Sequence, residues 1–539
     1  IPQTGDANIG AAVALQNFYY AGYLQDDIRL SSKLTINLGL RYETEAPYTE
    51  RYNQINSFDF NIASPLRAAQ YPNLTGGLVF AGPGNRTTFR SDKNNFAPRF
   101  GFAYSAMKKT VLRGGLGVFY SPLEVSGSDT GFSPSDGFSS ATVYLGTLDG
   151  VRPFRNIGNP FPEGLTKPVG NTLGAATFLG QATSVWMNSP TTPIVYQWNF
   201  DIQRELPGSF LLDLAYTASH GSHLTQNRDF NALVPSFLSL GTGLQTLVDN
   251  PFGSQVTTGP LAQPRIARRQ TLLPYPHFGS IFVINDTSGN STYHATNVKL
   301  EKRYKQGVGF LFAYTWAKLI SDVRNGLPTL DNGQNAGLNP GVQNWHDLRS
   351  ERSISELDVA HTFTLSYVAE LPFGKNKKFL NTLTGPAGKI IEGWQLSGIT
   401  AWRSGFPLNF SAPITGGGNR PNSTGRSAKI EDHQSRGASL QRWFDTTAFT
   451  IPAPFTFGNV GRNISDVRGP SQFNWDLSLS KTTAIRERLS LQFRAESFNM
   501  LNRPNFFLPV TNVVNVQFGQ INTSNGNPRI NQLALKLIF

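Results

Sequence analysis

The 539-residue chain contains no cysteine, and only 15% of its residues are charged. The first absence excludes disulfide frameworks, thiolate metal sites and cysteine nucleophiles. The second is well below the roughly 25% of an ordinary soluble domain. Long hydrophobic runs are also missing, because no stretch approaches the roughly 18 apolar residues of a transmembrane helix. These absences together exclude a helical membrane protein.

Chemical motifs are equally scarce. The net charge is +12, but the basic residues are scattered, so we expect no nucleic-acid partner. Neither a Gly-x-Ser-x-Gly elbow nor a His-Glu-x-x-His motif occurs, and we predict a non-enzyme without a cofactor. His220 and His223 supply two imidazoles where a metal site takes three or four ligands, so no metal is expected.

Aromatic residues and period-two alternation dominate what is present. Phe310, Phe312, Tyr314 and Trp316 alternate with smaller residues, and 473–480 alternates without exception. Such alternation predicts strands with unlike faces. The predicted strands are 16–30, 33–44, 96–106, 109–120, 194–206, 209–220, 292–304, 308–320, 359–371, 393–403, 472–482, 488–498 and 530–539.

The connections between these strands alternate in length. Most odd-numbered strands are followed by a turn of a few residues, and the ninth by a medium link. All other connections are long: 45–95, 121–193, 221–291, 321–358, 404–471 and 499–529. Short turns at one end and long loops at the other are typical of an outer-membrane barrel. A soluble sandwich or propeller is the alternative, but the hairpin spacing is too irregular for a propeller.

Several segments carry a family resemblance. They read YLQDD at 23–27, LTINLGLRYE at 34–43, NNFAPRFGFAY at 94–104, LPFG at 371–374, GWQLSG at 393–398, FRAESFN at 493–499 and LALKLIF at 533–539. In their order and spacing the chain resembles the Oar-like branch of the TonB-dependent outer-membrane receptors.

The resemblance implies a place and partners. Such receptors close with 22 strands around an internal plug, so we expect residues 1–539 to be the C-terminal part of the transmembrane barrel, all-β and antiparallel, without the plug. The implied site is the outer membrane of a Gram-negative bacterium. The implied partners are membrane lipid, the barrel assembly machinery, an unidentified extracellular ligand and a TonB-type energy-coupling complex acting through a plug absent here.

Eight charged residues are candidates for the inner wall of the barrel, because they alternate with apolar neighbours. They are Arg41, Glu43, Arg99, Lys299, Glu301, Arg303, Arg494 and Glu496. They could line a substrate path, with the ligand held by the external loops. Alternatively they solvate a watery lumen, pair across strands, or contact the plug.

The sequence leaves three functions to distinguish. The first is a receptor barrel that moves a large solute, such as an oligosaccharide, siderophore, peptide or protein. The second is a structural or surface-display barrel without active transport. The third is a β-rich enzyme such as a glycosidase, which would need paired carboxylates across a cleft that the sequence does not reveal.

A first prediction concerns the C-terminal residue. The last strand alternates and stops on the aromatic Phe539, which resembles the signal read by the barrel assembly machinery. Deleting Phe539 from the full-length protein should leave export to the periplasm intact and reduce insertion into the outer membrane. The measurement is loss of heat-modifiable migration together with accumulation in the periplasmic fraction. Normal insertion of the truncated protein would contradict the prediction.

Overall fold

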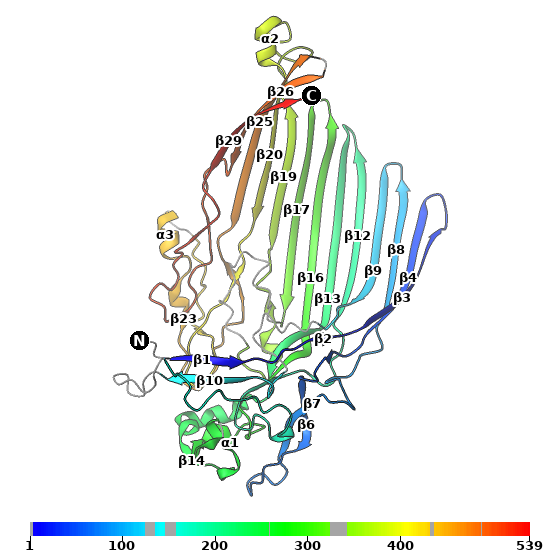
Figure 1. Cartoon of the computed structure of the whole chain (residues 1–539). Helices are drawn as coiled ribbons and strands as arrows, with labels where there is room; N and C mark the ends of the chain where they lie inside the picture. The colour runs from blue at the N-terminus through cyan, green and yellow to red at the C-terminus, as the bar shows by residue number, and fades with distance from the viewer. Residues whose placement is uncertain are drawn as a thin grey trace.

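One large antiparallel sheet organises the chain (Figure 1). Along its main path each strand pairs with the next long strand in sequence. The path comprises β3 (Tyr19–Arg29), β4 (Leu34–Glu45), β8 (Phe96–Met107), β9 (Thr110–Tyr120), β12 (Ile194–Leu206), β13 (Phe210–Asp229), β16 (Ile281–Lys305), β17 (Val308–Ser321), β19 (His361–Glu370), β20 (Trp394–Arg403), β25 (Gln472–Arg486), β26 (Leu489–Phe498) and β29 (Ile530–Ile538). The predicted all-β fold with thirteen long strands is confirmed for the described residues.

The computed structural model describes residues 4–123, 135–145, 158–257, 259–323, 342–431, 436–486 and 488–539. Parts of the predicted loops 121–193, 221–291, 321–358 and 404–471 lie outside these ranges. Among the described strands, β3 and β29 form the two edges of the sheet and do not pair with each other. Within the same ranges, no helix is both long and apolar enough to cross a membrane.

Tight turns join the strands at the upper end in Figure 1. Between β16 and β17, Gln306 and Gly307 have φ values of 56° and 78°. Between β12 and β13, Gly208 and Ser209 have φ values of 82° and 67°. Two successive positive φ values are characteristic of the type I′ turn, whose twist matches that of paired strands. These turns hold the hairpins in register.

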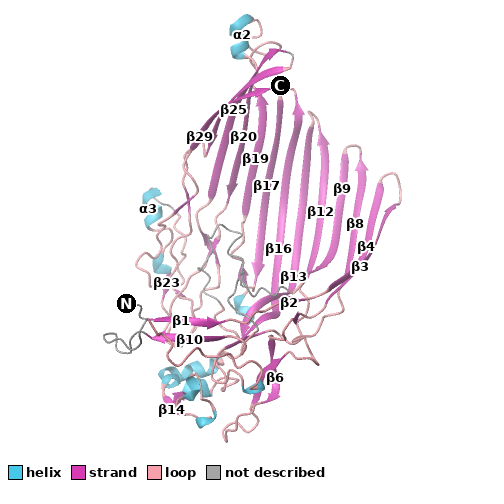
Figure 2. Cartoon of the chain, in the orientation of Figure 1, coloured by secondary structure: helices cyan, strands magenta, loops and turns pink. Residues whose placement is uncertain are grey.

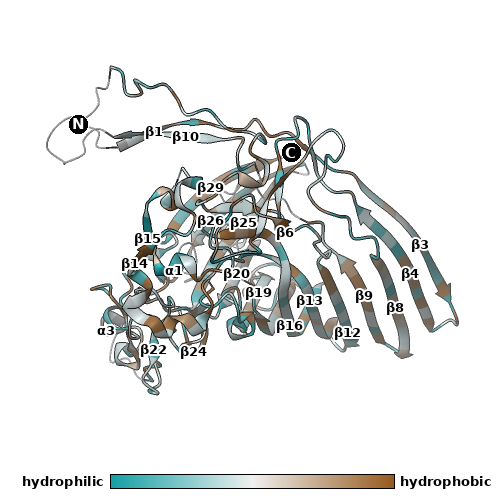
Figure 3. Cartoon of the chain, turned by 90° about the horizontal axis from the view of Figure 1, so that it is seen from below, coloured by the Kyte–Doolittle hydropathy of each residue, from teal (hydrophilic) through white to brown (hydrophobic). Residues whose placement is uncertain are grey.

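The register gives the sheet two unlike faces, seen as alternating bands along the strands in Figure 3. Phe310, Phe312, Tyr314 and Trp316 share one face of β17, because side chains of a strand alternate and directly opposed residues share a face. We call this side the aromatic face. The opposite side of β17, which carries Thr315, is called the charged face.

Two predicted boundaries were wrong. Residues 221–229 and 281–291 were assigned to the loop 221–291, but β13 continues to Asp229 and β16 begins at Ile281. The β13–β16 ladder shifts register three times between Ser222 and Arg228. Each irregularity breaks the alternation, so the pattern that revealed the rest of the strand fades there.

The long connections are themselves folded, at the lower end of Figure 1. They contain short strands, including β6 (Asn56–Ala63), β7 (Thr75–Phe80) and β10 (Ser140–Leu145), and β10 pairs with β1 (Thr4–Ile9), which precedes the main sheet. The few helices, such as α1 (Arg268–Thr271) and α3 (Arg436–Gln441), are short (Figure 2). We call these connections, taken together, the loop cap.

In the part of the chain that the structure describes, large buried hydrophobic clusters lie in the loop cap and at the start of β16. One joins Phe58, Leu78, Phe252 and Phe278, and a second joins Phe410 to Phe444 and its neighbours. The aromatic face has no such cover: Trp316 is 61% exposed. A sheet whose apolar side chains remain uncovered requires an apolar surrounding.

The two faces should differ in their tolerance of charge. Phe312→Arg, in mid-strand on the aromatic face, should destabilise a membrane-inserted barrel by about 2–4 kcal/mol. Thr315→Arg, on the charged face, should cost little. Reversible unfolding from lipid vesicles measures both variants. Equal losses at the two positions would show that the faces are wrongly assigned.

Candidate functional site

The charged face collects the sequence-predicted candidates. The charged face can be followed from strand to strand through directly opposed residues. It begins in β4, where Gly39 is opposite Arg99, and continues across the sheet to β26. Seven candidates lie on it: Arg41, Glu43, Arg99, Lys299, Glu301, Arg494 and Glu496. The eighth, Arg303, lies where the β16–β17 ladder shifts between Lys302 and Lys305.

Six of these residues form ion pairs within single strands. The pairs are Arg41–Glu43 at 2.6 Å, Lys299–Glu301 at 3.6 Å and Arg494–Glu496 at 3.8 Å. Each pair joins positions two apart, which share a face. Tyr19 adds a hydroxyl that donates to Glu43 Oε2 at 2.5 Å. Partly exposed pairs of this kind contribute about 0–1 kcal/mol, so their main effect is to keep this face polar.

A hollow of about 690 Å³ opens along β16, β17, β19, β20, β25 and β26. It brings Glu301 and Arg303 to the same space as Glu496, whereas Arg41, Glu43 and Arg99 lie elsewhere on the sheet and do not line it. Asp476 also lines it and was not among the candidates. Its place in the alternating segment 473–480 was the signal that could have found it.

A second, smaller hollow of about 230 Å³ lies in the loop cap. Its wall combines Trp345, Phe457, Asn344 and Arg269 with the glycines of 416–418. An added Cβ at Gly418 would lie 2.3 Å from Gln343 Oε1, so the Gln343 side chain, which donates to Gly458, would have to move. Three separate connections meet here, which sequence patterns could not reveal.

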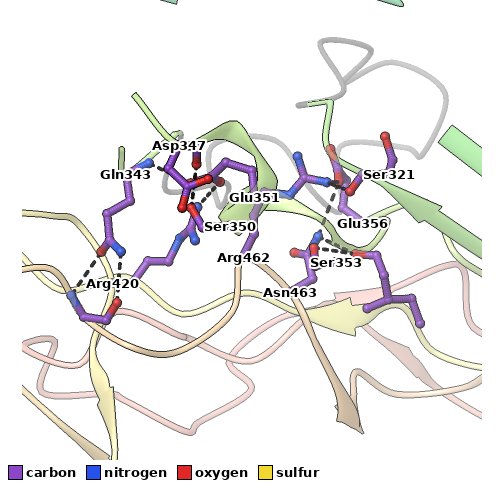
Figure 4. A network of polar contacts seen from close by, with 12 residues as sticks. Ser321, Gln343, Asp347, Ser350, Glu351, Ser353, Glu356, Arg420, Arg462 and Asn463 are labelled. Atoms are coloured by element: carbon purple, nitrogen blue, oxygen red, sulfur yellow. Dashed lines mark hydrogen bonds and ion pairs between the residues drawn. The ribbon is translucent and has the colours of Figure 1, made fainter. Parts of the chain in front are cut away.

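Buried ion pairs fasten two of these connections together (Figure 4). The segment between β17 and β19 is joined to the segment between β20 and β25 by Glu351–Arg420, Glu356–Arg462 at 3.9 Å and Asp358–Arg468 at 2.6 Å. Arg420 is 2% exposed and Glu351 is 0% exposed. A buried charge is costly unless it is paired, so each segment fixes the position of the other.

This pairing predicts a non-additive mutational cycle. Glu351→Leu or Arg420→Met alone should destabilise the loop cap by about 3–5 kcal/mol, because each leaves a buried charge without its partner. The double variant should recover most of this loss. Denaturant-dependent protection of the cap from protease measures all three. Additive losses in the double variant would contradict a coupled buried pair.

A buried histidine gives the loop cap a pH dependence. His277 is 0% exposed, packs against Phe278 and places Nε2 3.1 Å from the carbonyl oxygen of Gly76. Burial lowers the pKa of His277 to about 4. An unfolded histidine has a pKa of about 6.5. The neutral ring therefore contributes stability that is complete above about pH 6.5 and is lost as the pH falls toward 4.

The expected loss is about 3 kcal/mol between pH 7 and pH 4. Protease protection of the cap, measured over this range, should decline in the wild type and decline less in His277→Gln. His346→Gln, at an exposed position, is the control and should keep the wild-type profile. An unchanged pH profile in His277→Gln would refute the assignment.

The C-terminal strand presents Leu533, Leu535 and Leu537 opposite Ala495, Phe493 and Leu491, on the aromatic face. Phe539 follows the end of β29 and is 90% exposed. In the described part of the chain, no three His, Asp or Glu side chains gather in a way that could hold a metal ion.

Comparison with known proteins gives one family. A family model described as an outer membrane beta barrel domain matches residues 2–532. No curated protein matches the chain.

Solved structures of outer-membrane proteins are similar at low identity. The transporter YddB from Escherichia coli is 10% identical with a TM-score of 0.42, over 97% of this chain and 54% of its own. The ferripyoverdine receptor of Pseudomonas aeruginosa is 9% identical with a TM-score of 0.40, over 98% and 39%. BauA, the ferric preacinetobactin receptor of Acinetobacter baumannii, is 12% identical with a TM-score of 0.39, over 97% and 43%. The chain thus spans between about two fifths and one half of the length of these structures.

Proposed function

Because the chain belongs to the family of outer-membrane β-barrel domains and lies in the Gram-negative outer membrane, we propose that it is the barrel part of a TonB-dependent receptor of the Oar-like branch. In this proposal the loop cap captures a large extracellular solute. The charged face then lines the path that the solute follows. Energy comes from a TonB-type complex, and insertion depends on the barrel assembly machinery.

The hollow on the charged face is the observation that carries the proposal. It is wide, and Glu301, Arg303, Asp476 and Glu496 place charged groups among its apolar lining residues. A barrel that served only as a support would gain stability by filling its interior with side chains, as small barrels do. Charged groups on an open wall offer a polar solute hydrogen bonds in exchange for those that it makes with water.

The residues of the loop cap indicate the chemical class of the ligand. Its hollow offers the rings of Trp345 and Phe457 beside the amide of Asn344 and the guanidinium of Arg269. Aromatic faces with a few placed polar groups suit oligosaccharides and peptides. Siderophores and proteins complete the range of solutes proposed. No catalytic step is part of the proposal.

A second function, surface display without transport, is favoured by the construction of the loop cap. Its hydrophobic clusters and the buried Glu351–Arg420 pair hold the connections in one arrangement. A fixed external surface is what an adhesin or assembly scaffold requires. In this alternative the charged face only holds water.

Uptake by energised cells separates the two functions. Cells producing the full-length protein would be given radiolabelled maltooligosaccharide, a ferric siderophore and a hexapeptide, with and without a protonophore. The receptor proposal expects accumulation of at least one probe, abolished by the protonophore and reduced by Glu301→Lys in the hollow. Lys93→Gln, outside the hollow, is the control. Binding at the surface without accumulation would instead support display.

A further inference from the structure

A compact group of aromatic and cationic residues lies on the aromatic face, at the end nearer the loop cap. It spans six neighbouring strands, from β12 to β20. We call it the belt, and its members are Tyr196, Trp198, Tyr216, His220, His294, Tyr314, Trp316, Lys318, His361 and Trp402. Their shared face follows from the register of each strand pair. Three of the seven histidines of the chain are in this group.

The histidines are held in defined orientations. Tyr216 Oη lies 2.7 Å from His294 Nδ1, and Tyr314 Oη lies 2.8 Å from His361 Nδ1. In both pairs the two rings also stack, at centroid separations of 6.1 Å. A phenol that donates to Nδ1 leaves the proton of a neutral imidazole on Nε2. In that tautomer, and in the protonated ring, Nε2–H is a donor directed away from the tyrosine.

The third histidine follows the same arrangement. His220 stacks on Tyr196 at 6.4 Å and places Nδ1 3.2 Å from Thr292 Oγ1. Trp198 meets the ring of His294 edge-on at 6.2 Å. Ala218, at the base of this cluster, is 0% exposed. The rings thus form a packed surface and not a set of independent side chains.

The charge of this surface has one sign. Lys318 is directly opposite His294 and is exposed. His220 is directly opposite Thr292, which is opposite Ile320, and His361 is opposite Trp316. At the aromatic-face positions paired within 194–206, 210–220, 292–302, 308–320, 361–369 and 396–402, no Asp or Glu occurs. Closer to the loop cap, Asp322 accepts hydrogen bonds from Asn290, and Asp286 pairs with Arg228. No carboxylate therefore lies among the paired positions of the belt.

We propose that the belt binds the phosphate groups of the glycolipid that forms the outer leaflet. Tyrosine and tryptophan rings favour the level of the headgroups, and the long connections place this end of the strands outside. Cations at a membrane surface attract anionic lipids. The imidazole N–H donors and the Lys318 ammonium supply charge-assisted hydrogen bonds to phosphate oxygens. The inference requires only an outer-membrane barrel and is independent of transport.

The test compares lipid A carrying both phosphates with enzymatically dephosphorylated lipid A. The full-length protein in detergent would be titrated with each lipid and the bound lipid counted by native mass spectrometry. At pH 6 the phosphorylated form should bind more tightly, and Lys318→Gln should weaken it about fivefold, the effect of roughly one surface charge. His294→Gln with His361→Gln should weaken it further, because two N–H donors of the belt are lost.

Two control variants remove a cation and a histidine that lie outside the belt. Lys302→Gln removes a cation from the same face at the opposite end of β16, and His346→Gln removes a histidine of the loop cap; neither should change the preference. Heat-modifiable migration checks that every variant is folded. Equal affinity for the two lipids would overturn the proposal. So would displacement of lipid A by millimolar inorganic phosphate, which would indicate a site for the free ion.

Discussion

Backbone hydrogen bonding in an apolar surrounding is the constraint on which the rest of this structure depends. Each unpaired N–H or C=O in lipid costs several kcal/mol, so a strand can cross only beside another strand. The main sheet meets this requirement along its path from β3 to β29 by pairing every strand with its neighbours in sequence. The same ladder fixes the register, and the register decides which side chain meets which surrounding. The aromatic and charged faces are therefore consequences of one pairing pattern.

The loop cap is stabilised by other interactions, because it lies in water. Its segments have little regular structure and are stabilised by buried aromatic clusters and by ion pairs such as Glu351–Arg420. The extension of β13 and β16 beyond the other strands joins the two regions. The rigid hairpins thus support a hydrated, folded surface. The hollow on the charged face lies between the loop cap and the tight turns. This arrangement suits capture at one end and passage along the wall.

The long strands could be predicted from the sequence because a face between unlike surroundings imposes period two on every residue. The segment 473–480 shows this directly, and the register confirms that its side chains alternate. The pattern failed at Ser222–Arg228, where successive irregularities remove the alternation while the ladder continues. The loop cap could not be predicted, because Phe58 and Phe278 meet through chain closure over long separations without any local period. Likewise, alternation placed Glu301 and Glu496 on the charged face but could not show that they border one hollow.

Site-directed labelling of β17 tests the central claim most directly, since the chain has no native cysteine. Single cysteines at positions 309 to 316 of the full-length protein, in vesicles, would be exposed to a water-soluble thiol reagent and, after attachment of a fluorophore, to a lipid-borne nitroxide quencher. The two-faced sheet predicts strict alternation: strong quenching at Phe310, Phe312, Tyr314 and Trp316, and fast aqueous labelling at the residues between them. Uniform labelling, or a period other than two, would contradict it.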